Sequence, residues 1–543
     1  MPARTTRSSS RKPPTEEVPA KRAKRAASPP PAPPAKRTSR SRTRTTPAEP
    51  KTNGVAKAKS ASKAKAAPKS RVSAKAPLKA KPAPNEAEPV LPRKPKTPAP
   101  AKKRAPAVLP APLNPLPVPQ YICGQLGISA EFCADLDKPR RNPYVDKKIE
   151  ERAFGVDGAG LEAIAAGGLH TLFIDEKGTV WSCGANDNAA LGRVTITIPD
   201  PKNDKESIEV DEKTSIPNTL PVPIQSLVDE GFRAIQVVAG DSVSAAISDK
   251  GELRVWGTFR GNEGLVGFSS SSQREFKPTT VVDLHDEKFV SAAAGNNHLL
   301  LLTTYGNIYT LGTGEEGQLG RRVLERRKIH GTVPEKIVLG TRGRKAVVVG
   351  AGGNHSFAVD EEGTTWGWGV NSKGQTGTGV YDASIDREVH APKKVIGMSR
   401  GELGGATVVE IAGGDLHTLF LTSDGKVYAC GLSEEGRLGL ADDDAAFQDR
   451  KWPDFLPEPV QVTFPDPDDA VVHIACGTHN NLAVTRGGAL YSWGRQVMGE
   501  CGLGHDDDVK TPTVVVRKEG GAWSAIKAAC GGQHCLALLR KKT

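Results

Sequence analysis

A short block that runs from Gly-x-x-His to Leu-Gly recurs along most of this chain. The first clear copy, residues 166–193, reads AGGLHTLFIDEKGTVWSCGANDNAALGR. Successive copies lie 54 to 73 residues apart, measured between equivalent turn glycines. Those glycines are Gly167, Gly240, Gly295, Gly352, Gly414, Gly477 and Gly531. A repeat of this length indicates a fold built by stacking one supersecondary unit many times.

Each copy has the pattern of short β-strands separated by glycine turns. In the first copy, apolar segments at 161–166, 170–174 and 180–183 flank a turn at Lys177-Gly178. Glycine tolerates the positive φ that tight hairpin turns need. Short strands at regular spacing are typical of all-β repeat proteins, and radial repetition leaves only short, protected sheet edges. An open solenoid would need polar capping repeats, and the sequence shows none.

The two ends of the repeat region predict that the ring closes on itself. The last copy begins near Ala529 and lacks the Leu-Gly half, whereas a lone Leu-Gly half stands at Tyr121–Gly127. Together they would make a seventh blade shared by both termini. We therefore expect an all-β fold, a seven-bladed β-propeller over residues 114–543, with a long disordered basic N-terminal tail over residues 1–113.

The two parts carry opposite charge. Residues 1–113 contain 29 Lys and Arg against 5 Asp and Glu, and the remainder contains 45 basic and 57 acidic residues. The tail is rich in Ala, Pro and Ser and cannot bury enough apolar surface to offset its chain entropy. A basic tail on an acidic domain predicts contact with nucleic acid.

Motifs for covalent chemistry are missing from the sequence. We find no P-loop, HExxH or GxSxG pattern, no CxxC pair or zinc spacing among the eight cysteines, and no apolar run that could span a membrane. The start of the chain has no secretory signal. We expect a monomeric binding protein without cofactor or metal, with reduced cysteines in the cytosol or nucleus.

The second copy continues into a stretch of sequence that is more informative about function than the repeat itself. Residues 255–268 read VWGTFRGNEGLVGF. With the repeat over residues 120–543 and the basic tail before it, this stretch resembles the regulator of chromosome condensation family, and a fungal-type member of it. The resemblance implies a guanine-nucleotide exchange factor for the small nuclear GTPase Ran. In that family this stretch is a β-wedge that pushes into the GTPase.

The resemblance also implies individual site residues. The expected GTPase-binding and exchange residues are Asp241, Phe259, Arg260, Gly261, Asn262, Glu263, Gly264, Asn297, Arg321 and His534. The alternative to a GTPase contact, for Asp241 and for Arg321, is a charged loop residue that only faces solvent. Asn297 stands where vertebrate members have Asp, and Leu416 where a His is expected. The stretch before Gly124 lacks an acidic loop residue, so this half-blade is expected to be shortened.

The histidine of the Gly-x-x-His turn has a structural interpretation as well. It occurs in five copies, at His170, His298, His355, His417 and His534. A polar residue repeated around a ring more often satisfies neighbouring buried groups than binds a ligand. We favour that structural role for all of them except His534, which matches a family position implicated in exchange.

Basic residues predict a second set of contacts, with chromatin. The loop after Leu319-Gly320 carries Arg322, Arg326, Arg327 and Lys328. In the family this loop reaches the nucleosome. The alternative is that the loop only makes the protein more soluble. In the tail, Lys57, Lys59, Lys63 and Lys65 suit neutralisation of DNA phosphates. Two clusters are typical of nuclear localisation signals and imply a nuclear import receptor: Lys21, Arg22, Lys24, Arg25, and Lys102, Lys103, Arg104.

The residues alone leave two other functions to consider. The first is a chromatin-associated propeller scaffold that binds a protein partner without exchanging nucleotide, and the wedge distinguishes it from an exchange factor. The second is a propeller photoreceptor, which needs clustered interface tryptophans. The seven tryptophans here fall mostly on separate predicted strands, which disfavours that function.

Overall fold

The computed structural model describes residues 120–123 and 138–542, apart from 157, 202, 269–271, 282, 283, 285, 286, 325–328, 330, 342, 381, 383, 385, 386, 497 and 498. All of them fall in one compact unit, Pro98–Thr543. The tail residues predicted to be disordered, to bind DNA or to direct nuclear import lie outside the described residues.

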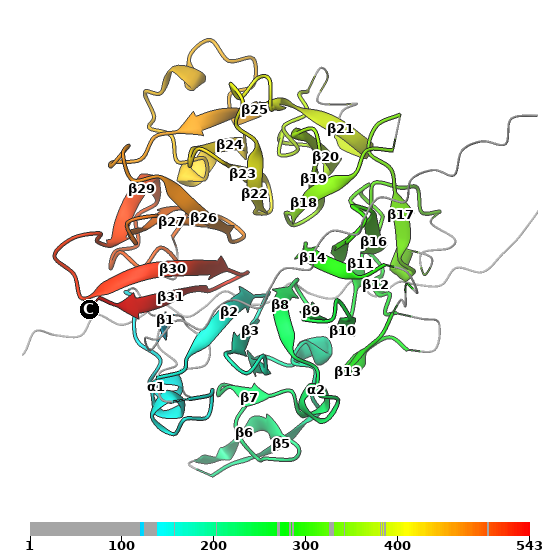
Figure 1. Cartoon of the computed structure of the whole chain (residues 1–543), viewed down its shortest axis with the longest axis vertical. Coiled ribbons are helices and arrows are strands. Elements are labelled where there is room, and N and C mark those ends of the chain that lie inside the picture. Colours follow the sequence, from blue (N-terminus) through cyan, green and yellow to red (C-terminus); the bar gives the residue numbers. More distant parts are fainter. Residues whose placement is uncertain are drawn as a thin grey trace, which may run out of the picture. The chain divides into compact units, whose positions relative to one another are not determined.

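Six antiparallel sheets of four strands each, here called blades 1 to 6, make up most of the fold (Figure 1). Blade 1 contains β2 (Leu161–Ala166), β3 (His170–Asp175), β4 (Val180–Gly184) and β7 (Val222–Pro223). Blade 2 contains β8 (Ala234–Ala239), β9 (Val243–Ser248), β10 (Leu253–Gly257) and β13 (Glu275–Thr279). Blade 3 contains β14 (Phe289–Ala294), β15 (His298–Thr303), β16 (Ile308–Gly312) and β17 (Glu335–Ile337).

The remaining blades follow the same order along the chain. Blade 4 contains β18 (Ala346–Ala351), β19 (His355–Asp360), β20 (Thr364–Val370) and β21 (Glu388–Ser399). Blade 5 contains β22 (Val408–Gly413), β23 (His417–Thr422), β24 (Val427–Leu432) and β25 (Phe455–Val462). Blade 6 contains β26 (Val471–Cys476), β27 (Asn480–Thr485), β28 (Leu490–Gly494) and β29 (Val509–Val516).

A smaller sheet, the terminal sheet, lies between blade 6 and blade 1. It contains β30 (Trp523–Cys530), β31 (Cys535–Lys541) and β1 (Gln120–Cys123). Strand β1 pairs antiparallel with β31, Tyr121 opposite Leu539, so residues from both ends of the unit share one sheet. Strand β30 contacts both β26 and β2, which closes the ring (Figure 1).

The prediction of a seven-bladed propeller is wrong. Among the described residues only six sheets have four strands, and the terminal sheet has three. The Gly-x-x-His turn joins the first two strands of a blade. Counting these turns therefore counts strand pairs, and it overestimates the number of complete blades.

Two elements lie outside the blades, together with short helices. Strands β5 (Thr195–Asp200) and β6 (Asn203–Asp211) form a ribbon inserted into blade 1, and β11 (Arg260–Gly261) and β12 (Gly264–Leu265) form a small hairpin inserted into blade 2. The helical elements include α1 (Pro143–Glu150), α2 (Gln225–Asp229) and the 3-10 turns Asp187–Ala189, Glu434–Gly436 and Ala445–Phe447.

The innermost turns of neighbouring sheets are joined by a closed circle of main-chain hydrogen bonds. Each bond runs from a turn amide to a turn carbonyl of the next sheet, with N···O distances of 2.8 to 3.4 Å. The pairs are Gly168–Gly240, Asp241–Asn296, Asn296–Gly353, Gly353–Gly414, Asp415–Thr478, Thr478–Gly531 and Gly532–Gly167. Turns this close together leave little room for side chains, which explains the repeated glycines.

The repeated histidines join sheets below this circle. Their Nε2 atoms lie 2.7 to 2.9 Å from a side-chain oxygen of an adjoining sheet, and all five are buried. The pairs are His170–Ser244, His298–Ser356, His355–Thr418, His417–Asn481 and His534–Thr171. A Cβ on Gly295 would lie 2.1 Å from the imidazole of His298, so the Gly-x-x-His spacing lets the ring fold over its own turn.

The structural interpretation of His170, His298, His355 and His417 is therefore confirmed. The partner of each is a side chain of the neighbouring blade. The hydroxyl that faces the histidine donates onward: Ser356 Oγ lies 2.8 Å from the Gln318 carbonyl oxygen, and Thr418 Oγ1 lies 2.8 Å from that of Gln375. In each of these two seams the histidine Nε2, the hydroxyl and a carbonyl oxygen form one chain of hydrogen bonds, while Nδ1 of the histidine is buried without a hydrogen-bond partner.

The Leu-Gly motif packs against an aromatic residue of the next blade. Gly192 has φ +67°, and a Cβ on it would lie 2.9 Å from the indole nitrogen of Trp256. Gly320 has the same relation to Trp368. In blade 6, Ser492 Oγ donates to the Cys501 carbonyl as Thr310 Oγ1 donates to that of Leu319. Cys501-Gly502 therefore takes the place of Leu-Gly in blade 6.

A different polar chain crosses the seams near the terminal sheet. His473 has Nδ1 2.8 Å from Glu410 Oε1 and Nε2 2.8 Å from the Ala528 carbonyl oxygen, so both nitrogens face acceptors. Burial alone would lower the pKa of His473, but the Glu410 carboxylate outweighs burial and raises it. Any stability from this charged pair is present below pH 6.5 and is lost as pH rises through the raised pKa.

The five histidines of the Gly-x-x-His turns predict a loss of stability in acid. Burial lowers the pKa to about 3 for His170, His298 and His355 and to about 4 for His417 and His534. Below pH 6.5 the unfolded chain binds protons that the folded chain excludes, so stability falls as pH falls. Each histidine contributes about 1.4 kcal/mol per pH unit, and together they contribute about 7.

Urea unfolding between pH 7.5 and 5 measures this slope. The double variant His298→Asn, His355→Asn should still fold, because asparagine already occupies the histidine position in blade 6, at Asn480. Its slope should be smaller by about 2.8 kcal/mol per pH unit. His390→Asn, at an exposed histidine, is the matched control and should keep the wild-type slope. Equal slopes in the double variant and the wild type would contradict the assignment.

Candidate functional site

The hairpin β11–β12 projects from blade 2 and ends in an exposed tip. Arg260 pairs with Leu265 and Gly261 with Gly264, and Asn262 and Glu263 form the turn. Arg260, Asn262, Glu263 and Gly264 are exposed. The sequence expected a projecting wedge here, and the structure places the tip at the surface.

The base of the hairpin is buried and rigid. The Phe259 side chain is fully buried, and its ring centroid lies 4.9 Å from that of Phe268. The Val266 amide donates to the Phe259 carbonyl at 2.9 Å, which closes the hairpin above this pair. Phe259 therefore anchors the hairpin in the core and does not present its own ring at the surface.

Three side chains from the surrounding loops bind the hairpin. Asn297 Oδ1 accepts the Arg260 amide at 2.8 Å, and Glu315 Oε2 accepts the Asn262 amide at 2.8 Å. Asp241 Oδ2 lies 3.4 Å from Arg260 Nη1, with both side chains well exposed. Exposed ion pairs contribute little to stability, so the two hydrogen bonds donated by the hairpin's main-chain amides do most to hold the hairpin in place.

The hairpin stands beside a polar opening at the centre of the ring. The turns of all six blades and the terminal sheet line this opening of about 160 Å³, with Asp241, Asn296 and Asp415 among the lining residues. Asn296 Nδ2 donates to Asp415 Oδ1 at 3.3 Å. A further hollow shares Asn296 and Asp415 and adds Glu316, Asn354, Arg387, Glu388 and Leu416. Carboxylates therefore outnumber cations around these two hollows, which favours a basic partner surface.

The structure places Arg321 in a supporting position. Its Nη2 donates to the carbonyl oxygens of Gly331 at 3.0 Å and Val333 at 2.9 Å, and its Nη1 lies 3.1 Å from Glu335 Oε2. Burial lowers the pKa of Arg321, and the Glu335 carboxylate opposes this. The guanidinium therefore fixes its own loop.

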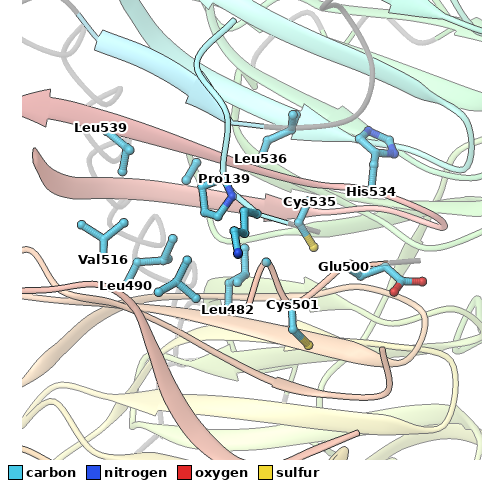
Figure 2. Close-up of a pocket in the computed structure, with 15 residues that line it drawn as sticks. Pro139, Leu482, Leu490, Glu500, Cys501, Val516, His534, Cys535, Leu536 and Leu539 are labelled. Atoms are coloured by element: carbon cyan, nitrogen blue, oxygen red, sulfur yellow. The ribbon is translucent and has the colours of Figure 1, made fainter. Parts of the chain in front are cut away.

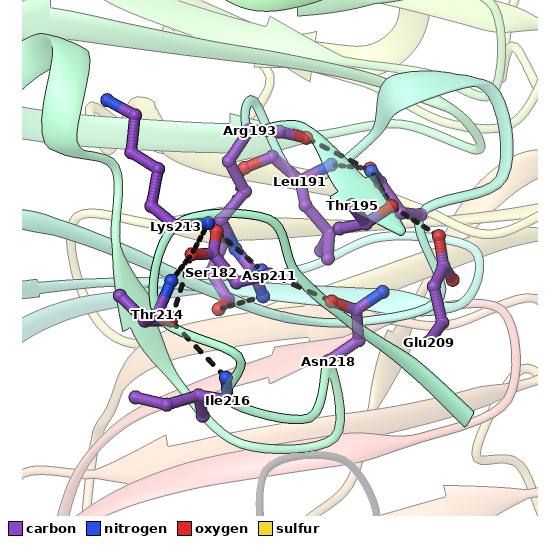
Figure 3. A network of polar contacts seen from close by, with 11 residues as sticks. Ser182, Leu191, Arg193, Thr195, Glu209, Asp211, Lys213, Thr214, Ile216 and Asn218 are labelled. Carbon is purple, nitrogen blue, oxygen red and sulfur yellow. Dashed lines mark hydrogen bonds and ion pairs between the residues drawn. The ribbon is translucent and has the colours of Figure 1, made fainter. Parts of the chain in front are cut away.

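Arg193 holds the corresponding position in blade 1. Its Nη1 lies 3.2 Å from Asp211 Oδ2 and from Asn218 Oδ1, and its Nε donates to Ser182 Oγ at 3.2 Å. Figure 3 shows these side chains converging under the inserted ribbon. The arginine after Leu-Gly thus closes the same kind of loop in both blades.

His534 is buried like the other turn histidines. Its Nε2 is 2.9 Å from Thr171 Oγ1 across the seam between the terminal sheet and blade 1. The imidazole is therefore part of the ring closure, and its role in exchange remains a prediction. Of the predicted nucleosome-binding loop, Arg322 is exposed, and Arg326, Arg327 and Lys328 lie outside the described residues.

The sequence interpretation missed Glu315, which binds the hairpin. Its local pattern, Gly-Glu-Glu-Gly, resembles the Ser-Glu-Glu-Gly of blade 5 at Glu434, so nothing in the repeat singled it out. Only the position of the blade 2 hairpin above this loop makes it distinct.

An apolar cavity lies between blade 6 and the terminal sheet, with His534 among its lining residues. Leu482, Leu490, Leu536 and Leu539 line it together with Cys501 and Cys535 (Figure 2). Six cysteines are free thiols, namely Cys183, Cys430, Cys476, Cys501, Cys530 and Cys535, and burial raises the pKa of Cys501. The described residues contain no group of three or more His, Cys, Asp or Glu placed to hold a metal ion. Within them, no helix is long and apolar enough to cross a membrane.

Comparison with known proteins identifies the family. Residues 121–537 match the family model described as RCC1-like domain. The chain belongs to the RCC1-like family. The Schizosaccharomyces pombe protein pim1 is 34% identical over 417 residues, which cover 76% of this chain and 72% of pim1. The Saccharomyces cerevisiae guanine nucleotide exchange factor SRM1 is 31% identical over 414 residues, which cover 74% of this chain and 81% of SRM1.

A solved structure of an RCC1-like protein agrees with the fold. The crystal structure of Prp20p from Saccharomyces cerevisiae, reported with its binding to Gsp1p and histones, has a TM-score of 0.65 and 28% identity. The match covers 79% of this chain and 93% of that one. Prp20, named there as yeast RCC1, has also been crystallised bound to Kap60, with the same TM-score and identity and with 82% and 97% covered.

Replacing Arg321 tests its supporting role in this RCC1-like ring. Arg321→Ala removes the hydrogen bonds of a half-buried guanidinium to the carbonyls of its own loop and should lower the free energy of unfolding by about 2 kcal/mol. Arg322→Ala removes a neighbouring exposed charge and should change it by less than about 0.5 kcal/mol. Urea unfolding at pH 7.5 compares the two. Equal effects would show that Arg321 does not support the loop.

Proposed function

We propose that this protein is a guanine-nucleotide exchange factor for a Ran-type small GTPase and that its basic tail holds it on chromatin in the nucleus. The exposed hairpin β11–β12 carries this proposal, because it is a rigid projection beside an acidic opening. Membership of the RCC1-like family supports it, as does the name of SRM1 as an exchange factor.

The hairpin would act by differential binding and needs no covalent chemistry. A tip that enters the nucleotide-binding region of the GTPase binds the nucleotide-free form better than the loaded form. Thermodynamic linkage then requires that nucleotide bind the complex more weakly, so it leaves faster. The direction of exchange follows from the nucleotide concentrations and not from this protein.

The hairpin has the rigidity that this mechanism needs. Its base is buried at Phe259, and its two anchors, Asn297 and Glu315, belong to blade 3. A flexible loop would have to become ordered when the GTPase binds, and the entropy cost of that ordering would weaken binding. Asp241, Asp415 and Glu316 around the hairpin would steer a basic partner surface towards it.

The tail would supply chromatin attachment separately from exchange. Its 29 basic residues suit DNA phosphates, and such contacts release counterions without reading sequence. Prp20p was studied for binding to histones, and Prp20 has been crystallised with Kap60. Nucleosomes and a nuclear import receptor are therefore proposed partners here, the latter through the clusters near Lys21 and Lys102.

Removal of the hairpin tests the exchange proposal. Deleting Arg260–Gly264 should slow the release of fluorescent GDP from a Ran-type GTPase at least about tenfold, which is about 1.4 kcal/mol of lost transition-state stabilisation. Binding to DNA should stay unchanged. Fast release by the deletion variant would contradict the role of the hairpin. No release by the wild type would favour the scaffold function.

Replacement of four tail lysines tests chromatin attachment. The full chain with Lys57, Lys59, Lys63 and Lys65 changed to Ala should bind DNA more weakly and with a shallower salt dependence. If each lysine contacts a phosphate, the slope of log affinity against log salt falls by about 3.6. The same four residues changed to Arg keep the charge and should keep the slope. Identical slopes in all three proteins would contradict these contacts.

A further inference from the structure

The carboxylate of Glu315 crosses from blade 3 to the hairpin of blade 2. Its Oε2 accepts the main-chain amide of Asn262, at the tip, at 2.8 Å. A hydrogen bond from an amide to an ionised carboxylate is roughly twice as strong as one between neutral groups. This bond fixes the turn itself, and the bond from Asn297 fixes the strand below it at Arg260.

The seam beneath the hairpin lacks the histidine bridge that five of the seven seams have. Val243 stands where most sheets have histidine, and Leu299 stands where the partner side chain is Ser, Thr or Asn. Both are buried in one apolar cluster with Phe259. Apolar packing is not directional. The direction of the hairpin relative to blade 3 therefore depends on the polar anchors above the seam.

The two anchors belong to one rigid unit of blade 3. The Thr313 amide donates to the Asn297 carbonyl at 2.9 Å, which joins the Glu315 loop to the turn that carries Asn297. Within the loop, Gln318 Oε1 accepts the Glu316 amide at 3.0 Å, and Gln318 Nε2 donates to Thr313 Oγ1 at 3.3 Å. Glu315 therefore extends from a fixed support.

Gly261 is shaped to receive this carboxylate. A Cβ at Gly261 would lie 2.8 Å from Glu315 Oε1 and 3.3 Å from its Cδ. The carboxylate thus lies against the bare Cα of the hairpin strand. At Gly264, on the opposite strand, a Cβ would meet nothing within 4 Å, but the φ of +123° there requires glycine. The two glycines serve different purposes, and only Gly261 serves the contact with Glu315.

The same position in blade 5 shows that this contact comes from the hairpin and not from the repeat. Glu434 is the third residue after the last glycine of β24, as Glu315 is after the last glycine of β16. Glu434 is exposed, and blade 4 has no inserted hairpin among its described strands. Glu434 is therefore a matched control for Glu315.

We propose that Glu315 is a positioning residue for exchange: through the Asn262 amide it holds the hairpin tip at the angle at which the tip can displace nucleotide. This inference rests on the proposed function, since it assigns a residue to the same hairpin. Glu315 acts through the hairpin, and its variants should therefore affect the release step more than the encounter with the GTPase.

The test compares Glu315→Ala, Glu315→Gln and Glu434→Ala in the full chain. Release of fluorescent GDP from a Ran-type GTPase gives kcat and KM. Glu315→Ala should lower kcat about tenfold or more and change KM less than about threefold, because a small misplacement of a working group is costly. Glu315→Gln keeps an oxygen that accepts the same bond and should stay within about threefold of wild type. Glu434→Ala should match wild type.

Trypsin provides a second measurement that does not involve the GTPase. The bond after Arg260 lies inside the hairpin, so cleavage there reports local opening. Glu315→Ala should be cleaved at this bond about tenfold faster than wild type, while its urea midpoint stays the same. Glu315→Gln and Glu434→Ala should keep the wild-type cleavage rate.

The outcomes separate this inference from the proposed function. If Glu315→Ala keeps the wild-type cleavage rate, the carboxylate does not position the hairpin and the inference is overturned. If cleavage rises but kcat is unchanged, the position of the tip is irrelevant to exchange, and the inference is overturned as well. If the wild type releases no nucleotide, the proposed function fails, while the cleavage rates still decide whether Glu315 fixes the hairpin.

Discussion

The circle of main-chain hydrogen bonds between the Gly-x-x-His turns is the contact on which the rest of the structure depends. Each turn amide donates to the next turn, and Gly532 donates back to Gly167 at 3.0 Å, so the circle has no free end among the described turns. The bonds require turns without bulky side chains. They also hold the loops that follow each turn at a fixed radius, which places Asp241, Asn297 and Asp415 on one face.

Differences between the seams explain where the candidate site lies. Most seams are bridged by a buried histidine and a hydroxyl or amide, and the seam between blades 2 and 3 is apolar at Val243 and Leu299. Within this seam the Gln236 side chain of blade 2 exchanges two hydrogen bonds of 3.0 Å with the main chain of β14. Above it, Asn297 and Glu315 of blade 3 add hydrogen bonds to the hairpin. These outer bonds lie near the surface, where they can orient a contact with a partner.

The sequence predicted the physical role of a residue only where that residue recurs at the same position in most copies of the repeat. The role of His298 and its equivalents was predictable, because a polar residue recurring at the turns of most blades is expected to satisfy its neighbours. Arg321 shows the opposite case. It occurs after Leu-Gly in blade 3 as Arg193 does in blade 1, but a loop charge in a sequence does not reveal that it binds carbonyls of its own blade.

The amino-acid sequence was enough to establish the order of strands and turns, the meeting of both ends of the repeat region in one sheet and the family. These depend on local patterns: apolar alternation, glycine at positive φ and a motif repeated at fixed offsets. The three-dimensional arrangement was needed to show that six sheets are complete and that the terminal sheet has three strands. It was also needed to show that Phe259 is buried and that Glu315 supports a hairpin 53 residues earlier in the chain. Contacts across a seam depend on how two blades are oriented, and no local pattern encodes that geometry.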